Sequence, residues 1–301
     1  MDTKTYPHLI QRKGISTEVV IQWNGEPLAG CYLVKNTLSD NKTGEEGTSV
    51  ILCPGGFDPN QGSFSQKAIR KLLAKPNISA VYEAHYCSEG KAGYLEPEPY
   101  KEDLKTIYAK SINNKPILVG MSASTIILLT SLYELGKENA LINAQSTLLI
   151  GPFLPDHRSF LGKNLRRYYD RKSMRDKIIH HCGHKHVFEN GDRLRKWWES
   201  NPELGQAIKN KAFKNLAKNL NSSLDALFFQ IDTLSIGGKR VLKNIFGANI
   251  IKEKIPKHHR SLLYIPEFDD MLADYCENIA ASSAVIKTQN KAREEQVSAS
   301  L

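Results

Sequence analysis

The chain of 301 residues is 41% hydrophobic, which is enough to bury a full core, and it carries a formal net charge of +9. Its apolar runs are all shorter than the ~20 residues of a membrane-spanning helix, and residues 1–14 do not resemble a signal peptide. The five cysteines are odd in number and widely spaced, so composition predicts a soluble, cytoplasmic protein with reduced thiols and no transmembrane segment.

The N-terminal part of the chain reads as an antiparallel hairpin followed by a buried strand. Two β-rich runs within residues 18–34 are joined by Asn24-Gly25-Glu26-Pro27, and Asn-Gly between such runs is a strong hairpin signal. After a polar loop, residues 49–53 are apolar and end in a turn, Pro54-Gly55-Gly56-Phe57.

Helix-like and strand-like segments then alternate. Helical spacing is found at residues 65–73 and 100–111, and buried-strand composition at residues 78–83, 117–119 and 144–150. Strands that alternate with helices imply a mostly parallel sheet. This alternation predicts that residues 1–152 form the first part of an α/β core.

The alternation stops between residues 153 and 222. This segment contains 16 Lys and Arg against 7 Asp and Glu, a balance of +9, so the rest of the chain is near neutral. Its apolar residues have helical spacing, which predicts a basic helical cap in which Trp197 and Trp198 form the core or line an acyl pocket. Residues 223–301 complete the α/β core, with strands at 224–231 and 249–255 and a helix at 269–285.

Residues 115–129 contain the strongest motif in the chain. A short β-branched strand runs directly into an apolar helix, so Ser122 lies on a strand-to-helix hinge. Such a hinge needs small flanking residues, which Gly120 and Ser124 provide. The pattern resembles the nucleophile elbow of the α/β-hydrolases, although that family usually has glycine where this chain has Ser124.

The resemblance to the α/β-hydrolase superfamily covers residues 18–285 and includes strand order, the Pro54–Phe57 turn, the elbow and a cap after the sixth strand. It implies a mostly parallel α/β-hydrolase sheet with an inserted helical cap, or lid, domain. By this resemblance Ser122 is the nucleophile, and the oxyanion hole combines the N–H of Ala123 with that of Gly56 or Phe57.

The family order of serine, acid and histidine suggests the remaining catalytic residues. We expect Asp232, after the strand at residues 224–231, to be the acid, with Asp225 and Asp156 as alternatives. The adjacent His258 and His259 follow the last strand, and we expect His259 to be the base. His85 is a third candidate and is expected in a loop.

The predicted cap contains two further clusters of polar residues. The segment His180–His186 holds four histidines and Cys182, but the spacing matches no tetrahedral zinc pattern, so we expect no metal and no cofactor. The basic and aromatic residues at 165–172 have no accompanying nucleic-acid motif, so nucleic acid is not the expected partner.

The sequence thus predicts a serine hydrolase or acyltransferase that acts on an acyl ester or thioester through a covalent acyl-enzyme. The basic cap favours an anionic substrate, such as an acyl chain on an acyl carrier protein or on coenzyme A. The alternative is a non-hydrolytic protein of this fold, a lyase, cyclase or ligand-binding protein, that uses the same pocket. The motifs identify neither the substrate nor the oligomeric state.

Overall fold

The computed structural model describes residues 13–39, 47–55, 64–88, 91–111, 115–152, 186–201, 222–227, 249–251 and 267–282. The strands are β1 (Ile15–Val20), β2 (Gln22–Trp23), β3 (Glu26–Pro27), β4 (Cys31–Leu38), β5 (Thr48–Cys53), β6 (Ile78–Ser88), β7 (Lys91–Ala92), β8 (Ile117–Met121), β9 (Ser146–Ile150), β10 (Ser223–Leu227) and β11 (Asn249–Ile251). The helices are α1 (Gln66–Leu73), α2 (Pro97–Lys110), α3 (Ser124–Lys137), α6 (His186–Ser200) and a helix at residues 267–282.

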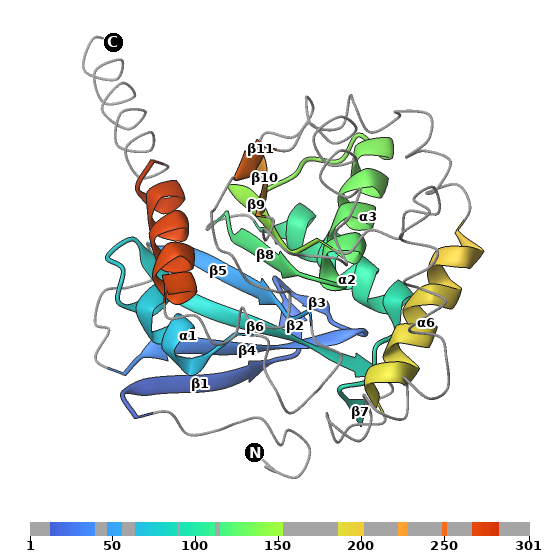
Figure 1. Ribbon diagram of the computed structural model, residues 1–301, viewed down its shortest axis with the longest axis horizontal. Helices are drawn as coiled ribbons and strands as arrows, with labels where there is room; N and C mark the ends of the chain where they lie inside the picture. Colours follow the sequence, from blue (N-terminus) through green and yellow to red (C-terminus); the bar gives the residue numbers. More distant parts are fainter. Residues whose placement is uncertain are drawn as a thin grey trace.

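A single mixed sheet forms the centre of the molecule (Figure 1). Its strand order is β1-β4-β6-β5-β8-β9-β10-β11, and the short β7 pairs with β6. Strand β4 is antiparallel to both of its neighbours, whereas all pairs from β6 to β11 along this order are parallel. The predicted α/β class and mostly parallel sheet are confirmed.

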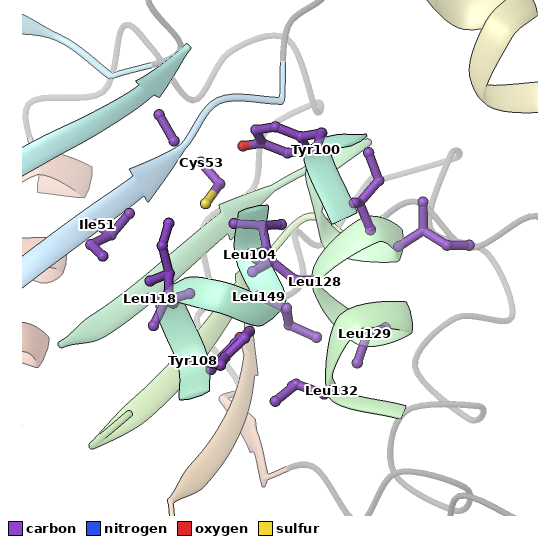
Figure 2. Close-up of a cluster of buried hydrophobic side chains, with 14 of the residues drawn as sticks. Ile51, Cys53, Tyr100, Leu104, Tyr108, Leu118, Leu128, Leu129, Leu132 and Leu149 are labelled. Carbon is purple, nitrogen blue, oxygen red and sulfur yellow. The ribbon is translucent and has the colours of Figure 1, made fainter. Parts of the chain in front are cut away.

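Helices cover both faces of the sheet, so the fold has three layers (Figure 1). Alternate residues of β5 point into opposite layers, because successive side chains of a strand face opposite sides: Ile51 and Cys53 pack against α2 and α3, whereas Val50 and Leu52 pack beneath α1 and the helix at residues 267–282. Figure 2 shows the first of these layers, where leucines of α3 meet Tyr100, Leu104 and Tyr108 of α2.

The antiparallel start of the chain is confirmed with a shifted boundary. Strand β1 begins at Ile15, three residues before the predicted start, and pairs with β4 over its whole length. Between them, β2 and β3 form a small ribbon whose tip is Asn24 and Gly25, with φ angles of 47° and 86°. Asparagine and glycine are the residues that adopt such left-handed angles most readily, which explains the hairpin signal.

A buried carboxylate joins this antiparallel part to α2. Asp103 accepts hydrogen bonds from the backbone N–H groups of Ala29, Gly30 and Cys31, at 3.0, 2.7 and 2.7 Å. Gly30 is needed because a Cβ there would lie 2.1 Å from the backbone nitrogen of Tyr100. The start of β4 therefore lies directly on the first turn of α2.

Helix α6, which belongs to the predicted cap, packs on the segment that leads into α2. The Asn190 side chain accepts from the Leu95 N–H at 2.9 Å and donates to the Gly93 carbonyl at 2.8 Å. Trp197 and Trp198 are buried in the same apolar cluster as α2 and α3, and Trp197 donates to Glu98 at 2.6 Å. The paired tryptophans are therefore core residues, in the apolar cluster that they share with α2 and α3.

The helix at residues 267–282 is fastened to both α1 and the sheet. Ser65 caps α1 by accepting from the Ala68 N–H at 2.9 Å, and its hydroxyl contacts the Asp269 carboxylate at 3.1 Å. Six residues further on, Tyr275 donates to Asp225 of β10 at 2.6 Å and contacts Ser146 of β9 at 2.8 Å. The helix at residues 267–282 thereby connects β9 and β10 to α1.

One sequence expectation about the sheet is wrong. Strand β6 does not end at Glu83 but continues to Ser88, so His85 lies in a strand and not in a loop. The extension arises because residues 84–86 pair with β4, with Tyr86 opposite Cys31 and His85 opposite Tyr32. Helix α2 also begins three residues earlier than predicted, at Pro97, a residue that favours the first turn of a helix.

Within the described residues, no helix is long and apolar enough to cross a membrane. Cys31, Cys53, Cys87 and Cys276 are free thiols, as predicted for these four positions.

We expect Asp103→Ala to lower the free energy of unfolding by about 3 kcal/mol, because buried N–H groups at the start of β4 lose their acceptor. The measurement is urea denaturation followed by circular dichroism. The control is Asp274→Ala, which removes an exposed ion pair with Lys75 and is expected to change stability by less than about 1 kcal/mol. Equal losses in the two variants would contradict the anchoring role of Asp103.

Candidate active site

Ser122 lies between β8 and α3 and has the backbone geometry expected of an elbow. Its φ angle is 50°, in the left-handed region that side chains disfavour. The other two non-glycine residues with positive φ in the described chain are Asn24 and Asn139, and asparagine tolerates this region far better than serine. Strain of about 1–3 kcal/mol at a serine is typical of a functional position.

Two glycines allow the elbow to pack this tightly. A Cβ on Gly120 would lie 2.2 Å from Leu128 Cδ1, so α3 lies directly on the end of β8. A Cβ on Gly55 would lie 2.3 Å from the Met121 carbonyl oxygen and 2.7 Å from Ser122 Cβ. The start of the turn that follows β5 therefore lies directly against the strand-to-helix hinge at Ser122.

The carboxyl ends of three neighbouring strands lie level with Ser122. The Ser122 N–H donates to the Ile150 carbonyl at 2.9 Å, and the Gly151 N–H donates to the Leu227 carbonyl at 2.9 Å. Met121, Ile150 and Leu227 are register partners across β8, β9 and β10. In open α/β sheets, ligands bind at this edge, beyond the carboxyl ends of the strands.

The residue after Ser122 lies immediately before α3. Ala123 is helical, with φ −64° and ψ −32°, and it is the N-cap of the helix. The first N–H groups of a helix lack partners within the helix, and its dipole favours negative charge at this end. The half-buried Ser122 therefore stands beside a helix terminus that suits a developing oxyanion.

Ser124 replaces the usual glycine of the motif and is fully buried. Its hydroxyl lies 2.7 Å from the Tyr86 hydroxyl and also hydrogen-bonds the Pro54 carbonyl oxygen. Tyr86 in turn donates to the same carbonyl oxygen at 2.5 Å. The extra hydroxyl is thus accommodated by hydrogen bonds to β6 and to the turn after β5. Tyr86 carried no signal in the sequence analysis.

Burial makes three of the thiols poor nucleophiles. Desolvation raises the pKa of Cys53, two residues before Gly55, to about 12. Desolvation also raises the pKa values of Cys31 and Cys276 well above the ordinary range. Because the thiolate is the reactive form, these cysteines are inert near neutral pH.

Two of the alternative catalytic residues lie within strands and have local partners. Asp225 is in the middle of β10, level with Leu148 and Val119, and its carboxylate accepts a hydrogen bond from Tyr275 at 2.6 Å. His85 is on β6, which is separated from β8 by β5, and its ring stacks on Tyr32 with centroids 5.2 Å apart. Neither residue lies on a loop after a strand, where the family resemblance places the acid and the histidine.

The other predicted site residues lie outside the described residues. They are Gly56, Phe57, Asp156, Asp232, His258 and His259. Of the His180–His186 segment, only the backbone of His186 is described, at the start of α6. Among the residues that the structure describes, no group of three or more His, Cys, Asp and Glu side chains could hold a metal ion.

The strand order, the antiparallel second strand β4, and a strained serine between the central strand β8 and its helix together define the α/β-hydrolase fold. The chain has this fold, as its sequence resemblance implied.

Comparison with solved structures supports this fold. No protein-family model and no curated protein matches the sequence. Among solved structures, a thermostable esterase from Pseudomonas putida matches with a TM-score of 0.57 at 13% identity, covering 92% of this chain and 86% of its own. A hyperthermophilic esterase from the archaeon Pyrobaculum calidifontis has a TM-score of 0.57 at 14% identity, covering 93% and 89%. An HSL homologue from a metagenome library has a TM-score of 0.56 at 12% identity, covering 93% of each chain.

The strain at Ser122 predicts an unusual ranking of two variants. Ser122→Gly should be more stable than Ser122→Ala by about 1 kcal/mol, because only glycine adopts φ 50° without strain. At Glu102, an exposed position inside α2, the order should reverse, with alanine about 1 kcal/mol more stable than glycine. Thermal unfolding of the four variants measures both differences. Alanine ahead of glycine at both positions would contradict strain at Ser122.

Proposed function

We propose that this protein is a serine esterase that hydrolyses a carboxylic ester through a covalent acyl-enzyme. The observation that carries the proposal is the left-handed backbone of Ser122 at the amino end of α3, on the edge of the sheet where ligands bind in such folds. The esterases that share the fold support the same activity class.

In the proposed reaction, Ser122 Oγ bonds to the ester carbonyl carbon while His259 takes the hydroxyl proton. The carbonyl oxygen becomes an oxyanion that accepts hydrogen bonds from the N–H of Ala123 and from that of Gly56 or Phe57. The alcohol then leaves with the proton from His259. Water then attacks the acyl-enzyme in the same way and releases the carboxylic acid product. Asp232 orients the imidazole of His259 throughout. No step uses a metal or an organic cofactor.

The chain after β10 and β11 is long enough for these assignments. Both strands run parallel to β8, so the segments that follow them leave from the same sheet edge as Ser122. Asp232 comes five residues after Leu227, so the extended chain can span about 16 Å. This exceeds the separation of β10 from β8, which is two strands, or about 10 Å. His259 comes eight residues after Ile251, a reach of about 26 Å against about 14 Å for three strands.

The direct test is labelling with a fluorophosphonate probe, read by intact mass. We expect one adduct on the native protein and none on Ser122→Ala, because the probe phosphonylates an activated serine. Hydrolysis of p-nitrophenyl acetate should fall by at least about 10³-fold in the same variant. The control is Ser200→Ala, an exposed serine at the end of α6, which should keep both the adduct and the activity.

Absence of an adduct from the folded native protein would contradict the esterase proposal. It would favour the alternative that the fold serves a lyase, a cyclase or a ligand-binding protein, and the next measurement would then be native mass spectrometry of the purified protein for a bound ligand.

A thioesterase or acyltransferase is a second candidate, favoured by the excess positive charge of residues 153–222. Reversing Arg166, Arg167 and Arg171 to glutamate together should raise KM for an acyl-coenzyme A thioester at least about tenfold, with little change for a small neutral ester. Steady-state kinetics at low and high salt provides the measurement, since salt screens such attraction.

The control for this charge reversal is a triple variant at exposed lysines elsewhere, Lys13, Lys115 and Lys137. It introduces the same change in net charge but should leave KM for both substrates within about twofold. Similar increases for the thioester in both triple variants, or for both substrates in the cap variant, would contradict a substrate site on the cap.

A further inference from the structure

Three segments that are distant in sequence meet at the Pro54 carbonyl oxygen. Pro54 directly follows β5, Tyr86 lies on β6, and Ser124 is the first residue of α3. The two hydroxyls lie 2.7 Å apart and both hydrogen-bond the carbonyl oxygen, as described above. Tyr86 is 4% exposed and Ser124 is fully buried, so water does not compete freely for these groups.

Either of the two hydroxyls can donate a hydrogen bond to the Pro54 carbonyl, so the pair of donors is redundant. Two hydroxyls supply two protons for three contacts, and a carbonyl oxygen only accepts. In each arrangement that uses both protons within the network, at least one is donated to Pro54. Burial raises the pKa of Tyr86, so its hydroxyl stays protonated near neutral pH. Loss of either hydroxyl alone therefore leaves the carbonyl with a donor, whereas loss of both removes both of the hydroxyl donors that the described residues provide.

The Pro54 carbonyl belongs to the peptide that opens the turn beside the nucleophile. The next residue, Gly55, is so close to the elbow that a Cβ there would lie 2.7 Å from Ser122 Cβ. The orientation of the Pro54–Gly55 peptide thus determines how the turn leaves β5, next to Ser122. In the proposed esterase, the N–H groups of Gly56 or Phe57 in this turn receive the oxyanion, and a misplaced donor loses most of its effect.

We propose that Tyr86 and Ser124 are positioning residues that hold the Pro54–Gly55 peptide, and with it the oxyanion-binding turn, in its catalytic orientation. The inference rests on the proposed esterase function. It also explains why serine stands where the motif usually has glycine: the hydroxyl adds a hydrogen bond between the elbow and the turn.

The test compares Tyr86→Phe, Ser124→Ala and the double variant with the native protein. Each single variant should lower kcat by less than about fivefold, because one donor remains on the Pro54 carbonyl. The double variant should lower kcat by about 10²- to 10³-fold, far more than the product of the single effects, with KM changed less than about threefold. The Ki of a trifluoromethyl ketone, which forms a tetrahedral adduct with the serine, should rise by the same factor as kcat/KM falls.

The chain offers a matched control in the same buried layer. Tyr108 of α2 and Thr147 of β9 form a hydroxyl pair at 3.0 Å and are 0% and 1% exposed. Neither residue contacts the turn or the elbow through a hydrogen bond that the structure describes. Tyr108→Phe with Thr147→Val should lower the melting temperature as the other double variant does, but keep kcat within about twofold.

Two results would overturn the inference while the esterase function stands. One is a folded Tyr86→Phe/Ser124→Ala protein that keeps kcat within about threefold of native. The other is an equal loss of kcat in the control double variant, which would mark the effect as general loosening of the core. Failure of the native protein to react with the fluorophosphonate would overturn the proposed function, and the positioning role with it.

Discussion

The hinge at Ser122 is the constraint on which the rest of the structure depends. A strand that passes into a helix without a loop forces one residue into a left-handed backbone, here with φ 50°. That geometry persists only where the surroundings hold it, and three features do so: Gly120 lets α3 lie on β8, Gly55 lets the neighbouring turn approach, and the Ile150 carbonyl accepts the Ser122 N–H. The strained backbone of Ser122 therefore depends on the close packing around it.

Two apolar layers supply the rigidity that this hinge needs. The strands beneath it, β5, β8 and β9, are fully buried and pack against helices on both faces. Polar side chains then join helices to the sheet. On one side Asp103 of α2 bonds the backbone at the start of β4, and on the other Tyr275 bonds Asp225 of β10. Because each of these side chains bonds across elements that are far apart in sequence, they define how the elements are arranged and not whether they form.

Helix α6 brings part of the basic segment onto the core near the start of α2. Its contacts are a buried asparagine, two buried tryptophans and an ion pair between Arg193 and Glu96. This combination of apolar burial and specific hydrogen bonds holds α6 on the core.

The sequence by itself determined the α/β class, the hairpin tip at Asn24 and Gly25, and the elbow at Ser122, because each depends on the backbone preferences and polarity of adjacent residues. Tertiary structure alone decided that His85 lies in a strand beside Tyr32, that Asp225 bonds Tyr275, and that Tyr86 meets Ser124 and Pro54. These contacts join residues separated by 32 or more positions. Strand order, register and helix packing bring such residues together, and no local preference encodes them.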